Sequence, residues 1–328
     1  MKLQMRLLLG HCLLALMLLA SGPVHSQSAS GWPAKPVKIV TAFAAGSASD
    51  IIARTLAQEL QSEYGQAFVV DNKPGASGII AAEFVTKSAP DGYTLMLTTN
   101  TVNSANPHLF KKLSYDPIKD FTPIARVASA TFILVVSAEN PAKSVPELVS
   151  FAKANAGKVN FAYGNSTGQI AGAAFNSLAG LNATAIPYKS TPQALAGLVG
   201  GEVTFLFVDL ASSQALLKAG RLRALAVTTE ARSSLAPDVP PLAGSANLGG
   251  FDLAAWVGIV GPAAIPADIT AKLSTSINRI LARKDVADRL TAMGTDVSPG
   301  TSAELQVYMG QQLLSWRDKI KAAGIQAE

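Results

Sequence analysis

Cysteine and histidine are almost absent from this sequence, and charged residues are few. The 328 residues include one cysteine, three histidines and 15% charged side chains. Protein zinc sites draw their ligands mainly from cysteine and histidine, so this inventory argues against metal catalysis. The single thiol, Cys12, lies in the segment that we expect to be removed, which leaves no disulfide. We expect neither a metal nor a cofactor.

The glycine-rich motifs of nucleotide and dinucleotide sites are missing as well. Basic residues are scattered along the chain and do not alternate with aromatic ones, so we expect no nucleic-acid partner. Hydrophobic residues make up 49% of the chain, and no low-complexity tract interrupts it. This composition and length predict an ordered globular protein with room for two domains.

Residues 1–26 have the pattern of a secretory signal peptide. Lys2 and Arg6 precede an apolar stretch at 13–20, and Val24-His25-Ser26 forms a small-x-small cleavage site. The apolar stretch is too short for a permanent membrane span. Without this segment the chain has 25 basic and 22 acidic residues, a net charge of +3. We therefore expect a soluble protein in the periplasm, acting as a monomer.

A strand followed by a helix at residues 37–60 is the first sign of a binding site. The run from Val37 is apolar and β-branched, and Ile52 and Leu56 begin an amphipathic helical stripe. Between them, the small residues of the first loop (residues 43–50) leave backbone N–H groups free at a helix N-terminus, which favours an anion. An ordinary βα turn is the alternative.

The rest of the mature chain alternates strands and helices, which predicts two α/β lobes with parallel sheets. We expect lobe 1 at residues 33–130 plus 254–328 and lobe 2 at 131–253. Residues 103–123 are predicted to form a loop with little regular structure. The chain would cross between the lobes near 127–131 and near 250–256, which permits hinge closure around a ligand.

A second loop, at residues 163–168, lies in lobe 2 and, like the first loop, connects a predicted strand to a predicted helix. It contains Gly164-Asn165-Ser166-Thr167-Gly168, which matches the G-x-S-x-G motif of serine hydrolases. That reaction needs a histidine after the serine, and the last histidine, His108, comes before it. A serine hydrolase that uses Ser166 is therefore the weaker alternative to a binding protein, and we expect no enzyme.

An ordered set of short motifs resembles the Bug family, the periplasmic solute-binding proteins of tripartite tricarboxylate transporters. The match covers essentially the whole mature chain. It includes Val37-Lys38-Ile39-Val40, Asp71-Asn72-Lys73-Pro74-Gly75, Ala89-Pro90-Asp91-Gly92-Tyr93, Tyr115-Asp116-Pro117, Pro187-Tyr188-Lys189, Ala219-Gly220-Arg221-Leu222 and Trp256-Val257-Gly258.

The resemblance implies a two-lobe periplasmic binding protein fold, type II-like, with a ligand cleft between the lobes. It also implies a carboxylate ligand, held by backbone groups and water, and delivery to inner-membrane transporter subunits. The ligand would be a di- or tricarboxylate or an aromatic carboxylate. The residues carried over as ligand-binding are Phe43, Ala44, Ala45, Gly46, Ser47, Asp50, Thr99, Asn100, Tyr163, Gly164, Asn165, Ser166, Thr167, Gly168, Tyr188 and Asp209.

Some of these assignments have a structural alternative. Asp50 could only favour the start of a helix, and Tyr188 could pack rather than bind. The chain also departs from the family pattern, with Gly46-Ser47 where a second glycine is usual and Gln169 at the start of the second helix. These departures bear on the ligand and not on the fold. A sensor protein that feeds a signalling system is the alternative to a transport receptor.

Overall fold

The computed structural model describes residues 31–245, 248–249 and 251–327. A short segment up to Trp32 is distinct from the body of the molecule, Pro33–Glu328. The predicted signal peptide, residues 1–26, lies outside the described residues. Within the described residues, no helix is both long and apolar enough to cross a bilayer.

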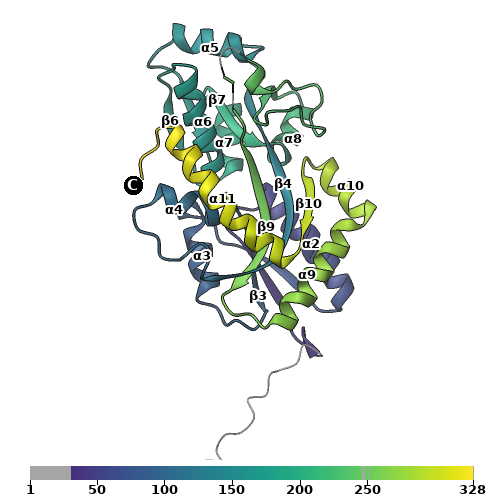
Figure 1. The fold of residues 1–328 in the computed structure, drawn as a ribbon. Coiled ribbons are helices and arrows are strands. Elements are labelled where there is room, and N and C mark those ends of the chain that lie inside the picture. Colours follow the sequence, from purple (N-terminus) through teal and green to yellow (C-terminus); the bar gives the residue numbers. More distant parts are fainter. Residues whose placement is uncertain (1–30, 246–247, 250, 328) are drawn as a thin grey trace, which may run out of the picture. The chain divides into compact units, whose positions relative to one another are not determined.

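A first group of strands forms one part of the sheet (Figure 1). β1 (Val37–Thr41) lies between β2 (Phe68–Asn72) and β3 (Thr94–Thr99), and all three are parallel. β9 (Ala254–Pro262) then pairs antiparallel with β3. β10 (Asp296–Gly300) joins this group by pairing antiparallel with β4, the long strand described in the next paragraph. The three parallel strands come from the βαβαβ pattern seen in the sequence.

One strand, β4 (Phe121–Ser137), belongs to both groups of strands. Its first part pairs with β9, and the last pair in that register is Thr131 with Ala254. From Phe132 onward it pairs with β7, and from Ile133 with β8. The second group is completed by parallel pairing around β5, and its strands are β5 (Asn160–Tyr163), β6 (Thr184–Pro187), β7 (Phe205–Asp209) and β8 (Leu222–Val227).

The helices begin and end at residues suited to those positions. Ser47 caps α2 by accepting a hydrogen bond from the Asp50 N–H, and Gly65 ends the helix in the left-handed conformation. Thr301 and Glu304 form a capping box at the start of α11. The helices are α2 (Ala48–Tyr64), α3 (Ile79–Thr86), α4 (Asn106–Leu109), α5 (Val145–Ala154), α6 (Ser166–Leu178), α7 (Thr191–Val199), α8 (Leu210–Lys218), α9 (Ala267–Ala282), α10 (Lys284–Ala292) and α11 (Ser302–Ala322), with short turns η2 (Ala76–Gly78), η3 (Thr101–Ala105) and η4 (Leu242–Gly244).

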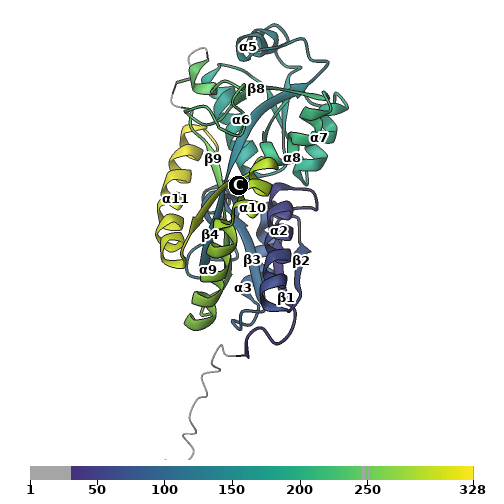
Figure 2. The ribbon, with the colours of Figure 1, turned by 90° about the vertical axis from the view of Figure 1, so that its right-hand side faces the viewer.

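The C-terminal helix α11 packs against both groups of strands (Figure 2). Leu305 and Met309 belong to the core cluster that contains Val40 and Trp256. Trp316, two turns further on, belongs to the cluster that contains the phenylalanines of β5 and β7. The helix therefore links the two cores, as β4 does.

The sequence pattern was incomplete at two places. Residues 103–123, predicted as a loop with little regular structure, contain the end of η3 and the whole of α4, and β4 already begins at Phe121. The predicted crossing near 127–131 lies on the continuous strand β4 and stays a prediction. The pair α10 and β10 was not predicted; α10 is strongly polar, and β10 contains a proline and pairs only with the distant β4.

Candidate ligand-binding site

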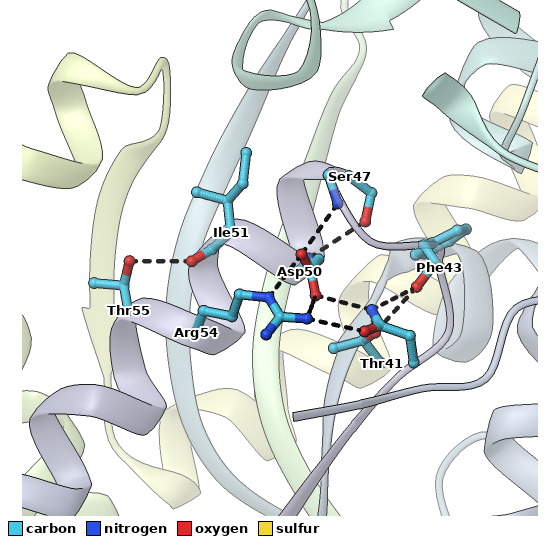
Figure 3. A network of polar contacts seen from close by, with 9 residues as sticks. Thr41, Phe43, Ser47, Asp50, Ile51, Arg54 and Thr55 are labelled. Atoms are coloured by element: carbon cyan, nitrogen blue, oxygen red, sulfur yellow. Dashed lines mark hydrogen bonds and ion pairs between the residues drawn. The ribbon is translucent and has the colours of Figure 1, made fainter. Parts of the chain in front are cut away.

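The first loop is held from inside by the carboxylate of Asp50 (Figure 3). Asp50 is 3% exposed. Its Oδ2 accepts hydrogen bonds from the Gly46 N–H at 3.1 Å and from Arg54 Nε at 3.0 Å, and its Oδ1 accepts one from Asn72 Nδ2 at 2.9 Å. Asn72 also donates to the Phe43 carbonyl at 3.0 Å. Asp50 therefore fixes the conformation of the loop that a ligand would meet.

These hydrogen bonds also set the charge of Asp50. Burial raises the pKa of its carboxyl group, but the bonds from Arg54, Asn72 and Gly46 outweigh burial, and the pKa lies below its ordinary value. The group is thus a carboxylate at neutral pH. Since both of its oxygens are already occupied by the loop and its neighbours, the geometry favours a positioning role over direct contact with a ligand.

The second loop leads from β5 into α6 and is held in a similar way. Asn165 caps the helix through Oδ1, which accepts from the Gly168 N–H at 2.9 Å, and its Nδ2 donates to Thr191 Oγ1 at 3.1 Å. A Cβ atom on Gly164 would lie 2.3 Å from the Thr191 nitrogen, and one on Gly168 would lie 2.7 Å from the Phe207 carbonyl. These two glycines permit close packing of the loop on its own neighbours.

Side chains of the second loop meet the segment that follows β3, and the first loop meets α8. Asn100 Nδ2 donates to Thr167 Oγ1 at 2.8 Å, and Ser166 Oγ donates to Thr101 Oγ1 at 2.8 Å. At the start of α2, the Ala48 N–H donates to Ser212 Oγ on α8 at 3.2 Å. The ends of β1, β3, β5 and β7 therefore converge, as expected for the carboxyl ends of parallel strands.

A small space of about 40 Å³, here called the inner cavity, lies at this convergence. One buried water needs roughly 10–15 Å³ of such space, so the inner cavity has room for about three water-sized groups. Among the described residues that line it there is no lysine, arginine or histidine. They are Phe43, Ser47, Ala48, Ser49, Thr99, Asn100, Thr101, Ala130, Phe132, Asn165, Thr167, Thr191, Asp209, Ala255 and Val257.

Backbone donors are available at this cavity. Ser49 is in the first turn of α2 and Thr167 in the first turn of α6, and both line the cavity. Their N–H groups make no hydrogen bond within the described part of the chain, as is usual for the first turn of a helix. Two helix N-termini, with free donors and partial positive charge, thus contribute residues to the lining of the same small space.

Asp209 is the one ionisable side chain in the lining of the inner cavity, among the residues described. It is 5% exposed and caps α8, with Oδ1 accepting from the Ser212 N–H at 2.7 Å. Burial raises the pKa of its carboxyl group, and the hydrogen bonds from Ser212 only partly oppose this shift.

A larger space of about 580 Å³, the outer pocket, shares Phe43 and Asn165 with the inner cavity. It is lined by loops from both groups of strands, and Lys189 is its charged residue among those described. Ala76 and Ser77 of this lining have positive φ angles of 44° and 50°, which are strained for residues other than glycine. The remaining lining is Ala42, Pro74, Gly75, Gly78, Leu109, Phe110, Tyr163, Gly164, Gln169, Pro187 and Tyr188.

The residues predicted from the sequence are thus distributed over three settings. Seven line the inner cavity, namely Phe43, Ser47, Thr99, Asn100, Asn165, Thr167 and Asp209. Tyr163, Gly164 and Tyr188 line the outer pocket, and the Tyr188 hydroxyl donates to Glu202 at 2.8 Å. Ala44, Ala45, Gly46, Asp50, Ser166 and Gly168 line neither space.

Several lining residues had no signal in the sequence. Ala130 and Phe132 come from β4, and Ala255 and Val257 come from β9, which reach the cavity only through long-range strand pairing. Thr101 lies just before the segment predicted to be irregular. Ser49 follows the N-cap residue Ser47 in the first turn of α2.

The hydrolase alternative lacks its base in the structure. Ser166 Oγ is bonded to Thr101, and the ring of His108 is paired with the Leu313 carbonyl at 2.9 Å. No histidine among the residues described therefore reaches Ser166 as a general base would have to.

Comparison with known proteins identifies the family. A family model described as "Tripartite tricarboxylate transporter family receptor" matches residues 52–325. The chain belongs to this receptor family. A UPF0065 protein of Bordetella bronchiseptica is 34% identical, over 95% of this chain and 92% of that protein. Members of the receptor family bind solutes and are not enzymes, so that expectation is confirmed.

Solved structures of similar proteins agree with the fold. Rpa4515 of R. palustris, solved with adipate, has a TM-score of 0.88 at 32% identity, over 90% of this chain and 100% of that one. The periplasmic binding protein BugD has a TM-score of 0.85 at 30% identity, with the same coverage. MatC of Rhodopseudomonas palustris, solved with malate, has a TM-score of 0.83 at 31% identity, over 88% of this chain and 100% of that one. The predicted periplasmic binding protein fold and the Bug resemblance are confirmed.

Proposed function

We propose that this receptor captures a small carboxylate in the inner cavity by closing two lobes around it. The observation that carries the proposal is the convergence of two capped helix N-termini on a cavity without basic side chains. A carboxylate there would accept hydrogen bonds from backbone N–H groups, and the helix dipoles would favour its charge. The adipate and malate bound to Rpa4515 and MatC support a carboxylate in this family.

The lobes in this proposal are residues 33–130 plus 254–328 and residues 131–253. The exchange of partners along β4, from β9 up to Thr131 to β7 from Phe132, supports a boundary at that point. Asn100 and Thr167 lie on opposite sides of the boundary and are hydrogen-bonded, so the described form corresponds to a closed one. A ligand favours closure only if it contacts both lobes.

A thermal-shift screen tests the capture step. Mono-, di- and tricarboxylates are compared with the neutral amides of the same acids. Stabilisation follows RT ln(1 + [L]/Kd), so a hundredfold excess over Kd adds about 2.7 kcal/mol to the free energy of unfolding. Amides should give no comparable stabilisation. If no acid stabilises the protein, or amides do so equally well, the proposed ligand class is wrong.

A filled-cavity variant identifies the site. Ala255 lines the inner cavity and is buried, so Ala255→Leu places a larger side chain in the space that the ligand needs. The variant should fold and lose the stabilisation by the best acid. Ala154→Leu, at an exposed residue on α5, is the matched control and should keep it. Equal ligand responses in both variants would place the site elsewhere.

We further propose that the closed, liganded form is recognised by the membrane subunits of a tripartite tricarboxylate transporter. Closure brings surfaces of both lobes together, and the open form lacks that composite surface. Uptake of the identified acid should fall in cells that lack the protein. Unchanged uptake combined with tight binding would favour a sensor role instead.

A further inference from the structure

One wall of the inner cavity consists of hydrogen-bond acceptors. Asn100 is 1% exposed, and its Nδ2 donates to Thr167 at 2.8 Å. Its Oδ1 is buried and has no partner among the described residues. Asp209 lines the same cavity; its Oδ1 accepts from the Ser212 N–H at 2.7 Å, and the Ser212 side chain and the Asp209 backbone N–H add hydrogen bonds to its carboxyl group. An anion-binding cavity would not normally contain a buried carboxyl group of the protein as well.

A buried acceptor without a donor destabilises the state that buries it. No lysine, arginine or histidine lines the inner cavity in the described part of the protein, so no such side chain supplies the donor. The ligand itself is the group that enters this space. A donor group on the ligand would satisfy Asn100 Oδ1 and add a hydrogen bond to the Asp209 carboxyl group, while the carboxylate of the ligand is held at the helix N-termini.

The size of the cavity limits where that donor can be. About 40 Å³ has room for a carboxylate and roughly one more group of similar size to water. A donor attached to the carbon next to the carboxylate fits this space. Any longer part of the ligand has to leave past Phe43 and Asn165, which are shared with the outer pocket.

We infer that the ligand is a carboxylic acid with a hydroxyl or ammonium group on its α carbon, and that Asp209 and Asn100 select for that group. This inference rests on the proposed carboxylate function. The α substituent donates to the acceptor wall, and the carboxylate accepts from the N–H groups of the helix starts. The remainder of the molecule lies in the outer pocket, which accommodates side chains of different length.

Matched acids that differ only in the α substituent test the inference. Each α-hydroxy acid is paired with the analogue that has a methyl group in its place: malate with 2-methylsuccinate, lactate with isobutyrate, mandelate with 2-phenylpropionate. Aspartate, which has an ammonium group on its α carbon, is compared with the two acids of the first pair. A site built to bond a ligand donor rejects an analogue that lacks it, so we expect at least about tenfold weaker binding of the methyl partner by titration calorimetry.

The variant Asp209→Asn separates the proposed role of Asp209 as a ligand acceptor from its role as the cap of α8. Asparagine keeps an oxygen that can accept from the Ser212 N–H, and it replaces the other carboxylate oxygen with a donor. The preference for the hydroxy or amino acid over its methyl partner should be lost, while the unliganded protein stays folded. Asp238→Asn, at an exposed carboxylate, is the control and should retain the preference. A purely structural role for Asp209 would not change the ratio within a pair.

Three outcomes are distinguishable. If acids bind and every methyl partner binds as tightly as its hydroxy acid, the inference is overturned and the proposed carboxylate function stands. The inference is likewise overturned, with the carboxylate function intact, if Asp209→Asn keeps the full preference. If no acid of any pair binds, the inference fails, and the proposed function fails with it when no carboxylate of the thermal-shift screen binds either.

Discussion

At the scale of single residues, the polar groups in this site shape the loops, line the cavity or do both. Asp50 uses its side chain on its own loop and does not line the inner cavity, Asn165 and Asp209 each cap a helix and also line it, and Asn100 lines it with one buried oxygen unpartnered. The sequence suggested all four as ligand-binding, because a residue type at a strand end does not reveal which neighbour its oxygens will contact. Only the packed loop separates the two roles.

The role of Asp50 predicts a pH-dependent stability. Its pKa in the folded protein lies below the ordinary value of 3.8, so the unfolded state takes up protons first as the pH falls. The stabilisation is therefore fully present above pH 3.8 and is lost as the pH drops towards the folded pKa. At pH 7, Asp50→Asn should lower the free energy of unfolding by about 2 kcal/mol, since charged hydrogen bonds each contribute about 1.5–3 kcal/mol.

Urea unfolding of the wild type and Asp50→Asn between pH 7 and pH 3 measures this effect. The difference between the two proteins should shrink as the pH falls below 3.8. The exposed Asp238→Asn variant should differ little from wild type over the same range. A constant difference at all pH values would mean that Asp50 acts through its shape and not through its charge.

At the scale of elements, the βα units with recognisable caps were predicted well and the long-range strand pairs were not. Helices α2, α5 and α6 begin at capping residues that the sequence displays, namely Ser47, Ser144 and Asn165. By contrast, the early part of β4 contains Pro123, Arg126 and Ser129, which break the pattern of a buried strand. It is a strand because β9 and β10 pair with it, and local sequence holds no signal for those partners.

Two helical glycines also differ in a way that the sequence does not reveal. Replacing each by alanine should change the stability of the protein in opposite directions. In α6, a Cβ on Gly172 would lie 2.3 Å from the ring of Phe161, whereas in α11 a Cβ on Gly310 would have no atom within 4 Å. Gly172→Ala forces β5 and α6 apart and should destabilise the protein by about 1–3 kcal/mol. Gly310→Ala only restricts the unfolded chain and favours the helix, so it should stabilise by about 0.5–1 kcal/mol.

Thermal and urea unfolding of the two variants provide the measurement, and each variant is the control for the other. Both changes add the same methyl group inside a helix, so helix propensity alone would stabilise both. Stabilisation by Gly172→Ala would show that the Phe161 contact is not close in solution.

At the scale of the whole molecule, three connections limit how the proposed lobes can move. β4 is continuous across the boundary, β9 pairs with it up to that point, and α11 contributes Met309 to one core and Trp316 to the other. A motion that keeps both cores intact has to be a small rotation about these elements rather than a free swing. The bonds Asn100–Thr167 and Ser166–Thr101 join the two proposed lobes directly, so they would form and break with that rotation.

This arrangement predicts that Ser166 sets the balance between open and closed forms. Ser166→Ala removes the bond to Thr101 and leaves the lining of the inner cavity unchanged, because Ser166 does not line it. A neutral hydrogen bond contributes about 1 kcal/mol, so the ratio of closed to open unliganded protein should fall about fivefold.

Small-angle scattering of unliganded Ser166→Ala should then show a larger radius of gyration than that of the wild type. Saturating acid should reduce the difference, because a ligand that contacts both lobes favours closure in both proteins. Ser177→Ala, exposed near the other end of α6, should scatter as the wild type does. If the radius responds neither to Ser166→Ala nor to a tightly bound acid, the lobes do not move, and the protein binds its ligand as a rigid receptor.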